Sequence, residues 1–428
     1  MDKIIEKIEV PVMKKYDVIV AGGGVAGIAA ALAARREGKS VLLLEKSMML
    51  GGLATLGLIN YFVPMCNGRG KRIIYGMVSE FIELSTKYGW EVVPKDWENG
   101  EPEKPTNVRY AVRYSPYIFA LALTEQVIKE VIDLYFDTIA SRPVMDGSHC
   151  KGIIVENKSG RQFFEGSIII DATGDADILF RAGVPTIQGK NYFTYIAKAI
   201  DIEHCKKTVE SNRIEKAIYN ISGGNANLYG KNHPEGMEYY TGTTAESVNN
   251  FIIRNQLELI GKIKNDVKET RDIVTLPGMA QFRTTRCIEG DYILEETDFY
   301  KHFDDSVCAI NDFERPDYLL EVPYRTMIRK GFDNLITAGR SVSGKGYAWD
   351  CLRVIPPAIL TGQAAGLAAV LAIDTKKAIY EINIEDLQKK LKEQEVMIHF
   401  DNSLIPENAK PGERICISKD TPAHDEVS

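Results

Sequence analysis

Tyr16-Asp-Val-Ile-Val-Ala-Gly-Gly-Gly-Val-Ala-Gly27 decides the fold of this chain, together with the two runs that follow it. Val18 to Val20 is short, apolar and β-branched, which is typical of a buried parallel strand. Ile28-Ala-Ala-Ala-Leu-Ala-Ala34 has high helix propensity, and Ser40-Val-Leu-Leu-Leu-Glu45 has the pattern of a second buried strand. The sequence therefore predicts a strand, a glycine turn, a crossover helix and a second parallel strand.

The glycine spacing in this stretch is Gly22-x-Gly24-x-x-Gly27. At such a turn the first glycine permits a tight bend, the second lets the backbone approach a pyrophosphate, and the third lets the helix pack on the strand. The phosphates would lie at the helix N-terminus, where unpaired N–H groups and the helix dipole favour an anion. Glu45 ends the next strand, where a carboxylate accepts from a ribose hydroxyl and disfavours a 2′-phosphate. The pattern therefore predicts a bound dinucleotide, FAD or NAD rather than NADP.

A membrane-spanning segment is the alternative interpretation, because residues 18–34 are nearly free of charge. That segment holds four glycines and is close to the shortest length that spans a bilayer. Asp17 and the pair Arg35-Arg36 close it on both sides. We therefore expect no membrane association.

The composition is that of an ordinary globular chain. The 428 residues are 45% hydrophobic and 26% charged, which leaves room for two or three domains. The net charge of −7 disfavours a nucleic-acid partner, which would need a basic surface. Residues 1–12 mix charges with isoleucines and lack the continuous apolar core of a secretory signal. The seven cysteines lack CxxC spacing, so we expect reduced thiols in a cytoplasmic protein and no metal site.

The rest of the chain alternates between helical and extended patterns. We expect helices at 73–88, 117–134, 246–271, 358–372 and 384–397. We expect strands at 134–139, 150–156, 161–165, 167–170, 291–296 and 333–338, and an extended segment at 273–288. The predicted buried positions include Leu121, Ile128 and Val131 of the second helix, and Leu257 and Ile260 of the third.

Short motifs along the chain, taken in order, resemble those of the FAD-dependent oxidoreductases, specifically the glutathione-reductase-like flavoproteins with two dinucleotide-binding domains. The motifs are Gly22-Gly-Gly-Val-Ala-Gly27, Gly51-Gly-Leu-Ala-Thr55, Asp171-Ala-Thr-Gly-Asp175 and Ala338-Gly-Arg-Ser341. The resemblance extends from residue 16 to residue 372 and is specific only in these motifs. It implies non-covalently bound FAD, because the early glycine loop carries no histidine or cysteine where some relatives attach the flavin.

The resemblance also implies which part of the cofactor each motif contacts. In such flavoproteins the Gly-Gly pair that begins here at Gly51 lies along the pyrophosphate and the flavin, and the Ala-Thr-Gly turn follows a three-stranded meander. Many relatives hold the ribityl chain with a carboxylate after the late glycine, whereas here Arg340 follows Gly339, which leaves the ribityl ligand open. The N-terminal dipole of helix 358–372 would favour negative charge on a reduced flavin. The residues expected to bind FAD are Gly22, Gly24, Val25, Ala26, Gly27, Glu45, Lys46, Gly51, Gly52, Leu53, Ala54, Thr55, Ile139, Ala140, Ala172, Thr173, Gly174, Gly339, Arg340 and Pro357.

The expected fold class is α/β: a Rossmann-like FAD-binding domain with a parallel sheet and a β-meander insertion, plus an α+β substrate-capping domain. The middle segment lacks the second GxGxxG and the paired cysteines that a pyridine-nucleotide–disulfide reductase needs, so we interpret it as the cap. The expected division is the first part of the FAD-binding domain at 1–59, a capping helix and loop at 60–110, the FAD-binding helix and meander at 111–185, the substrate domain at 186–324, the final FAD-binding strand and helix at 325–375, and a C-terminal helix and tail at 376–428.

The candidates for substrate contact are Arg283, Arg286, Tyr347 and Arg353. A partly buried guanidinium can bind a carboxylate at two points, although each arginine alone is more often a structural ion-pair partner. Tyr347 follows the turn Gly344-Lys-Gly346, which we expect to face the flavin. His302 is interpreted either as a proton carrier or as a surface histidine.

The main hypothesis is an enzyme that transfers a hydride between N5 of FAD and a small organic substrate, with a carboxylate as one option. The alternatives are a flavin-binding subunit of an electron-transfer complex, a flavin-dependent RNA-modifying protein, and an NAD-dependent dehydrogenase. The acidic balance of the chain gives the RNA alternative no support, and the meander and the strand before Gly339 oppose the dehydrogenase. A small-molecule substrate is the expected partner, and homo-oligomer formation is left open.

Overall fold

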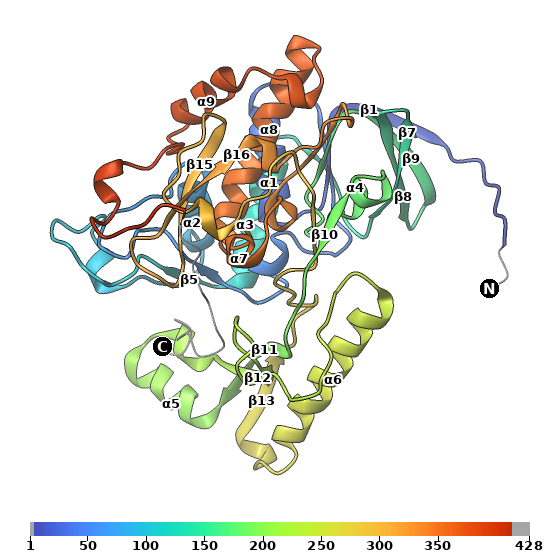
Figure 1. The fold of residues 1–428 in the computed structure, drawn as a ribbon. Helices are drawn as coiled ribbons and strands as arrows, with labels where there is room; N and C mark the ends of the chain where they lie inside the picture. The colour runs from blue at the N-terminus through green and yellow to red at the C-terminus, as the bar shows by residue number, and fades with distance from the viewer. Residues whose placement is uncertain (1–3, 413–428) are drawn as a thin grey trace.

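A seven-stranded sheet forms the centre of the larger body of the molecule, which is drawn in the upper part of Figure 1. The computed structural model describes residues 4–412. The strand order is β6-β2-β1-β9-β8-β7, and β17 pairs with the end of β9. The strands span Val12–Ala21 (β1), Val41–Leu44 (β2), Asp133–Tyr135 (β6), Ile139–Asp146 (β7), His149–Asn157 (β8), Gly160–Asp171 (β9) and Leu335–Thr337 (β17). The expected combination of a parallel sheet and a meander is confirmed.

Strand β1 is buried on both faces of this sheet. It runs parallel to β2 and β9, with Val20 opposite Leu43 and Ile170. Val20 belongs to a hydrophobic cluster shared with helices on one side of the sheet, and Ile19 belongs to a second cluster shared with the meander on the other side. Since both faces are covered there, the last four residues of the strand, 18–21, are continuously apolar, whereas its first residues are exposed and include Lys14 and Lys15.

Strand β9 joins the meander to the parallel part of the sheet. The prediction of separate strands at 161–165 and 167–170 is wrong, because β9 runs without a break from Gly160 to Asp171. Gly166 lies between the two expected strands, and a Cβ there would lie 2.8 Å from Ile19 Cδ1. Glycine here permits close packing and does not end the strand. The first half of β9 pairs with β8, and its last residues pair with β17.

Helices α1 (Val25–Arg36) and α8 (Ile355–Thr375) pack against each other on one side of the sheet. A small residue permits this approach, because a Cβ on Gly362 would lie 2.1 Å from the carbonyl oxygen of Ala26. By length and composition α8 could cross a membrane, but the whole of its apolar window is buried inside the protein. It is therefore the core helix of this fold. The burial of β1 and α1 likewise shows that the membrane interpretation of the glycine stretch is wrong.

Helix α3 (Pro116–Lys129) buries a narrower face than its sequence predicts. Phe119 and Leu123 are buried four residues apart, in keeping with helical periodicity. Leu121 and Ile128 are exposed by 71% and 59%, so their predicted burial is wrong. They lie away from the core side of the helix, and Val131, just past its end, is exposed as well.

A smaller lobe, which we call the cap, lies below the body in Figure 1. Its sheet has the order β12-β11-β13, with helices α5 and α6 on either side in this view. These elements span Thr194–Asp201 (β11), Tyr219–Asn225 (β12), Arg271–Thr275 (β13), Ile202–Ser211 (α5) and Ala245–Ile263 (α6). The cap has its own hydrophobic cluster, which includes Phe251 and Leu259. Leu257 and Ile260 are exposed, contrary to the prediction, because α6 buries only one of its faces.

The segment 186–324 divides between the cap and the body. Its later part forms the hairpin of β15 (Ser306–Asn311) and β16 (Leu319–Pro323), which belongs to the main hydrophobic cluster together with α8. The boundary expected at residue 324 therefore does not match the packing. Residues 291–296 also form no strand, and Leu294 makes only an isolated bridge to Gly344.

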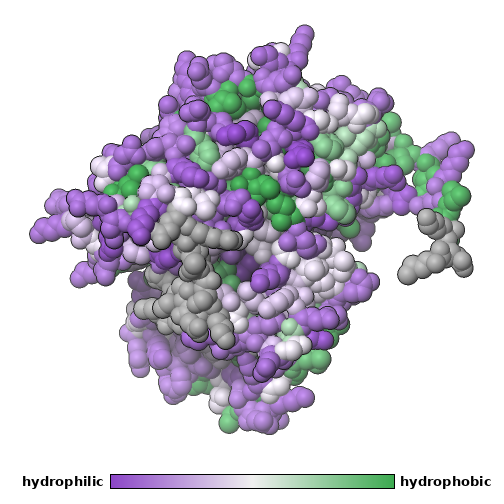
Figure 2. Space-filling view, in the orientation of Figure 1, coloured by the Kyte–Doolittle hydropathy of each residue, from purple (hydrophilic) through white to green (hydrophobic). Residues whose placement is uncertain are grey.

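Residues 60–110 were expected to form a helix and a loop over a pocket. Helix α2 (Met77–Thr86) packs into the main hydrophobic cluster, and Asn60, Tyr61, Val63, Trp90 and Val92 of this segment line the large cavity described below. The rest contributes to a small sheet of order β3-β5-β4. The other helices and strands are β3 (Tyr61–Phe62), β4 (Glu91–Val92), β5 (Val112–Tyr114), α4 (Asp177–Arg181), β10 (Thr186–Gln188), β14 (Arg286–Ile288), α7 (Gly346–Leu352) and α9 (Ile384–Glu393). On the face drawn in Figure 2, hydrophobic residues form separate patches within a mostly hydrophilic surface.

Candidate functional site

A cavity of about 1330 Å³ lies between the body and the cap. Its walls come from the carboxyl ends of β1, β2 and β9, from the N-termini of α1 and α8, and from the cap strands β11, β12 and β13. Sites for small molecules usually measure about 300–1,000 Å³, so this cavity has room for a dinucleotide and a further ligand. The carboxyl edge of a parallel α/β sheet is also where such ligands bind.

The glycine turn after β1 forms the part of the wall that a pyrophosphate needs. Gly22 has φ +110°, and a Cβ there would lie 2.4 Å from the Ala172 carbonyl oxygen, so only glycine fits. A Cβ on Gly24 would meet no atom within 4 Å, because this residue borders the open cavity at the start of α1. The first N–H groups of a helix have no partner within the helix and attract anions. The chain therefore fits the phosphates of a dinucleotide here.

The second glycine loop extends the same wall. Gly51 forms a parallel bridge with Gly24, and its N–H donates to the Gly23 carbonyl oxygen at 2.8 Å. Gly51 has φ +101° and Gly52 has φ +55°, both in the left-handed region that favours glycine. Two segments from different parts of the sequence thus present a continuous backbone surface to the cavity.

Glu45 is held in place by two backbone donors. Its Oε2 accepts from the N–H of Gly23 at 2.7 Å, and its Oε1 accepts from the N–H of Ser47 at 2.7 Å. The residue is 7% exposed and lines the cavity. Each carboxylate oxygen can accept a further hydrogen bond, so the side chain suits a ribose hydroxyl.

Asp171 organises the turn that follows β9. Its buried carboxylate accepts from the N–H and the hydroxyl of Thr173 at 3.0 and 2.7 Å, and from the N–H groups of Ile178 and Leu179 at 2.9 Å. Burial raises the pKa of Asp171, against the hydrogen bonds that favour its charged form. The carboxylate therefore joins the turn to the start of α4 and presents the Ala-Thr-Gly backbone to the cavity.

Most residues expected to bind FAD lie in this wall. They are Gly22, Gly24, Val25, Ala26, Glu45, Lys46, Gly51, Gly52, Leu53, Ala54, Ile139, Ala140, Ala172, Thr173, Gly174, Gly339 and Arg340. Gly27, Thr55 and Pro357 are not among the lining residues. A Cβ on Gly27 would lie 1.9 Å from the Gly22 carbonyl oxygen, the fully buried Thr55 hydroxyl donates to the Leu50 carbonyl oxygen at 2.5 Å, and Pro357 is buried in the first turn of α8. Contact between FAD and each lining residue stays a prediction.

Arg340 uses its guanidinium within the protein. Its Nε donates to the Gly174 carbonyl oxygen at 2.8 Å, and an Nη donates to the Phe282 carbonyl oxygen at 2.6 Å. Its other Nη pairs with Asp175 at 2.6 Å. Arg340 therefore ties the turn after β9 to the segment that returns from the cap, and it offers no carboxylate to a ribityl chain.

The residues predicted to contact substrate separate into two groups. Arg283 and Arg353 line the cavity, and Arg353 also pairs through Nε with Asp350 at 2.7 Å. Arg286 and Tyr347 do not line it. Arg286 donates to the Asp175 carbonyl oxygen at 2.8 Å and pairs with Asp177 at 2.7 Å, and the buried Tyr347 hydroxyl donates to Asp312 at 2.8 Å. For these two residues the structure supports the ion-pair or packing alternative over substrate contact.

Sequence reasoning missed a group of polar residues on the cap side. Lys198 of β11 lines the cavity and donates from Nζ to the side-chain oxygens of Asn60 at 3.1 Å and Asn220 at 2.7 Å. Burial and the nearby Arg113 lower the pKa of Lys198 to about 8. A signal was present in the sequence, since the alternation of the strand puts Lys198 on the opposite face from Tyr195 and Ala197, which belong to the cap cluster.

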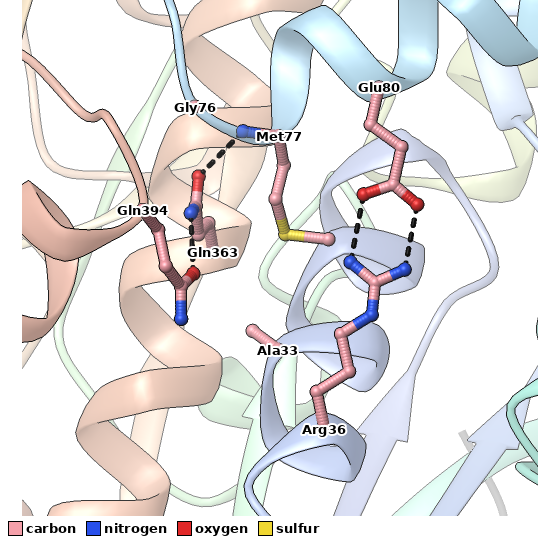
Figure 3. A pocket seen from close by; sticks show the side chains of 7 residues that line it. All are labelled: Ala33, Arg36, Gly76, Met77, Glu80, Gln363 and Gln394. Carbon is pink, nitrogen blue, oxygen red and sulfur yellow. Dashed lines mark hydrogen bonds and ion pairs between the residues drawn. The ribbon is translucent and has the colours of Figure 1, made fainter.

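A smaller cavity of about 320 Å³ lies between α1, α2 and α8 (Figure 3). Its charged groups already satisfy one another, because Arg36 binds both carboxylate oxygens of Glu80 at 2.7 and 2.8 Å. Gln363 accepts from the N–H of Met77 at 3.0 Å and donates to Gln394 at 2.8 Å. The chemistry of this cavity is structural, and we place no ligand in it.

His302 lies outside the large cavity, which disfavours its interpretation as a proton carrier for that site. It forms a cluster with the fully buried Glu321 and with His399, in which ligand atoms lie within 4.8 Å of one another. The Nδ1 atoms of the two histidines lie 2.5 and 3.0 Å from the Glu321 carboxylate. Ligands around a tetrahedral zinc with bonds of about 2.0–2.1 Å lie roughly 3.3 Å apart. The shorter distances are those of hydrogen bonds.

Several solved structures are similar to this chain. A geranylgeranyl bacteriochlorophyll reductase-like protein from Thermoplasma acidophilum is 12% identical, with 91% of this chain and 94% of that chain covered and a TM-score of 0.44. A flavoprotein/dehydrogenase from Cytophaga hutchinsonii is 14% identical, with coverage of 88% and 82% and a TM-score of 0.44. A myxobacterial FAD-dependent chondrochloren halogenase is 12% identical, with coverage of 89% and 79% and a TM-score of 0.45. Identities and scores at this level transfer no activity.

No curated protein matches the chain. The family model described as FAD dependent oxidoreductase matches residues 17–221 and 197–391, which together span the sheet, the cap and α8. The matched region contains both glycine loops, Glu45 and the turn after Asp171, whose geometry fits a dinucleotide. FAD is therefore the cofactor, and the chain belongs to the FAD-dependent oxidoreductase family.

Proposed function

We propose that this protein transfers a hydride between FAD and a small organic carboxylate held on the cap side of the cavity. When bound, FAD supplies the centre that accepts or donates two electrons. The chain supplies the position of the substrate, the exclusion of water and the charge that orients it. The proposal rests on a single observation, which is that one cavity joins the glycine wall to a wall carrying Arg283 and Arg353.

The arginines support a carboxylate as the substrate group. A guanidinium presents paired donors that match the two oxygens of a carboxylate, and burial strengthens the bond. Arg353 lies just before α8, whose first residues also line the cavity. Arg283 lies on the segment between the cap and β14. The two side chains therefore give the cavity positive charge from the body and from the cap connection, which favours an anionic substrate without fixing where its carboxylate lies.

Anaerobic reduction of the FAD-loaded protein tests this function. The purified protein is mixed with a panel of small 2-hydroxy and 2-amino acids and, as matched controls, with the corresponding alcohols, amines and amides. We expect at least one acid to bleach the visible flavin band, and its neutral analogue to do so far more slowly. Bleaching only by a reduced protein partner would favour the electron-transfer subunit instead. Equal bleaching by acids and neutral analogues would contradict the carboxylate.

A further inference from the structure

The cavity is lined, where the cap meets the body, by cations for which the described residues provide no carboxylate partner. In the part of the chain that the structure describes, Arg113, Lys198, Lys207 and Lys216 line the cavity and form no ion pair. The acidic Glu215 beside them pairs with Arg213. Surface lysines elsewhere in the chain often do have partners, such as Lys206, which pairs with Glu203 at 2.8 Å. The excess positive charge therefore faces the cavity.

Lys198 and Arg113 are connected through neighbouring residues. Lys198 Nζ donates to the side chain of Asn60, and the next residue, Tyr61, pairs across β3 and β5 with Arg113. The Arg113 guanidinium lies 5.3 Å from the centre of the Tyr61 ring. The cap strand β11 and the small sheet of the body thus bring two cations together at the same wall.

We propose that Lys198 and Arg113 form an anion-binding subsite that holds the carboxylate of the substrate at the boundary between the cap and the body. This inference rests on the proposed function, because it assigns the substrate's charged group to a particular place in the same cavity. It also makes Lys198 a substrate-binding residue that the motifs of the sequence do not reveal.

The hydrogen bonds of Lys198 favour this role. An ammonium group has three donors, and two of them are taken by the amide oxygens of Asn60 and Asn220. These amides orient the ammonium without neutralising it, and they leave one N–H for a ligand. Arg113 adds a guanidinium whose donors match a carboxylate. An anion placed here would be bound by charge from both sides of the cavity.

The charge state of Lys198 supplies a specific signature. Burial, followed by the repulsion of Arg113, lowers its pKa to about 8. The titratable groups on the cap side of the cavity wall and beside it are Tyr61 on β3, Arg113 on β5, Tyr117 on α3, Tyr219 on β12, His204 and Lys207 on α5, and Glu215 and Lys216 just after α5. Strand β13 places the uncharged Thr275 opposite Lys198. A bound anion would stabilise the charged lysine and raise its pKa. When an anion binds at a pH close to the pKa of Lys198 in the unliganded protein, the complex should therefore take up protons.

Calorimetric titration of the FAD-loaded protein with malonate tests the subsite. The titrations are run at pH about 8.5 in buffers of different ionisation enthalpy, so that the slope gives the protons taken up. Inorganic phosphate tests whether another anion binds as well as a carboxylate, and malonamide is the neutral control. We expect wild-type protein to bind malonate with uptake of roughly half a proton, and to bind phosphate more weakly.

Variants separate the subsite from a general effect of charge. Lys198→Met should weaken malonate binding by about 10-fold or more and remove the proton uptake. Lys198→Arg should keep most of the affinity but show no uptake, because arginine does not titrate in this range. Lys206→Met, on the same cap, should match the wild type. If Lys198→Met loads FAD poorly, the comparison of Lys198→Arg with wild type still decides the question.

Four results would contradict the subsite. Failure of malonate to bind wild type, tighter binding of phosphate than of malonate, unchanged affinity in Lys198→Met, or proton uptake that persists in Lys198→Arg would each overturn the subsite. The proposed function is read separately, from bleaching of the flavin. Malonate binding that depends on Lys198 in a protein that no acid reduces would leave the subsite standing while removing the proposed reaction.

Discussion

The two walls of the large cavity offer a ligand different chemistry. The body wall is made mainly of backbone, with glycines at the turns after β1 and β2 and one oriented carboxylate, Glu45. The cap wall is made of side chains, among them Lys198 and Lys207, on a lobe with its own hydrophobic cluster. Backbone donors suit a cofactor that never changes. Side chains on a separate lobe can be replaced without changing the backbone wall, which is why our proposed substrate contacts lie on the cap side.

The strongest test of the backbone wall compares two glycines of the same turn. In Gly27→Val the new Cβ would lie 1.9 Å from the Gly22 carbonyl oxygen, which no rotamer relieves. We expect little or no folded protein, measured as soluble yield and far-ultraviolet circular dichroism. Normal folding of this variant would contradict the close helix–strand contact.

Gly24→Val should separate folding from cofactor binding. Its Cβ would meet no protein atom within 4 Å, and the backbone at φ −70° suits valine. The side chain would instead occupy the cavity where the phosphates are expected. We expect wild-type circular dichroism but FAD affinity lowered on the order of 100-fold or more, measured by absorbance of the purified protein. A yellow variant would refute the role of this turn.

Arg340 links the two walls, and its loss should cost stability in both. In Arg340→Met, Asp175 and the carbonyl oxygens of Gly174 and Phe282 lose a buried charged partner. We expect the free energy of unfolding to fall by about 3 kcal/mol, measured by urea denaturation. Arg325→Met is the control, because its pair with Asp305 is exposed and should contribute less than about 1 kcal/mol. Equal effects would contradict the linking role.

The independence of the cap can be tested through α6. Leu259 is 4% exposed and belongs to the cap cluster, whereas Leu257 on the same helix is 63% exposed. Leu259→Ala should destabilise the cap by about 2 kcal/mol or more, seen as faster proteolysis within α6, while FAD stays bound. Leu257→Ala should change stability by less than about 0.5 kcal/mol. Loss of FAD in Leu259→Ala would show that the two walls are not independent.

The smallest expected change in stability comes from His302, which forms a cluster with Glu321 and His399 outside the large cavity. Burial lowers the pKa of His302, but hydrogen bonds to Asn402 and Glu321 outweigh it and raise the pKa above its ordinary value of 6.5. A raised pKa means that this stabilisation is full below about pH 6.5 and is lost as pH rises through the folded value.

His302→Gln should therefore be less stable than wild type at low pH and equally stable at high pH. The loss at low pH should be less than about 1 kcal/mol, because the His302 ring is partly exposed. Urea unfolding across this range measures the difference. His149→Gln is the control, since in the described residues His149 forms no ion pair. A difference that grows with pH would have the wrong sign.

Local spacing was enough to predict much of the cofactor wall. Gly22, Gly24 and Glu45 lie within one strand–turn–helix–strand unit, whose geometry follows from short-range backbone preferences. The substrate residues were harder to predict, because the partner of a long polar side chain comes from a distant segment. Arg286 forms an ion pair with Asp177, and the Tyr347 hydroxyl donates to Asp312. The residues next to Arg286 and Tyr347 in the sequence do not reveal these partners.

By itself the sequence determined the parallel sheet, the glycine turns and the dinucleotide that they accept, since periodicity and glycine spacing act over a few residues. Only the tertiary structure decided which cations face the cavity. Lys198 meets Asn60 across 138 residues of chain, and β15 and β16 join the body although they follow the cap. Such contacts depend on how the cap packs against the body. That packing is set by the shapes of two surfaces whose residues come from distant parts of the chain, so no single stretch of sequence predicts it.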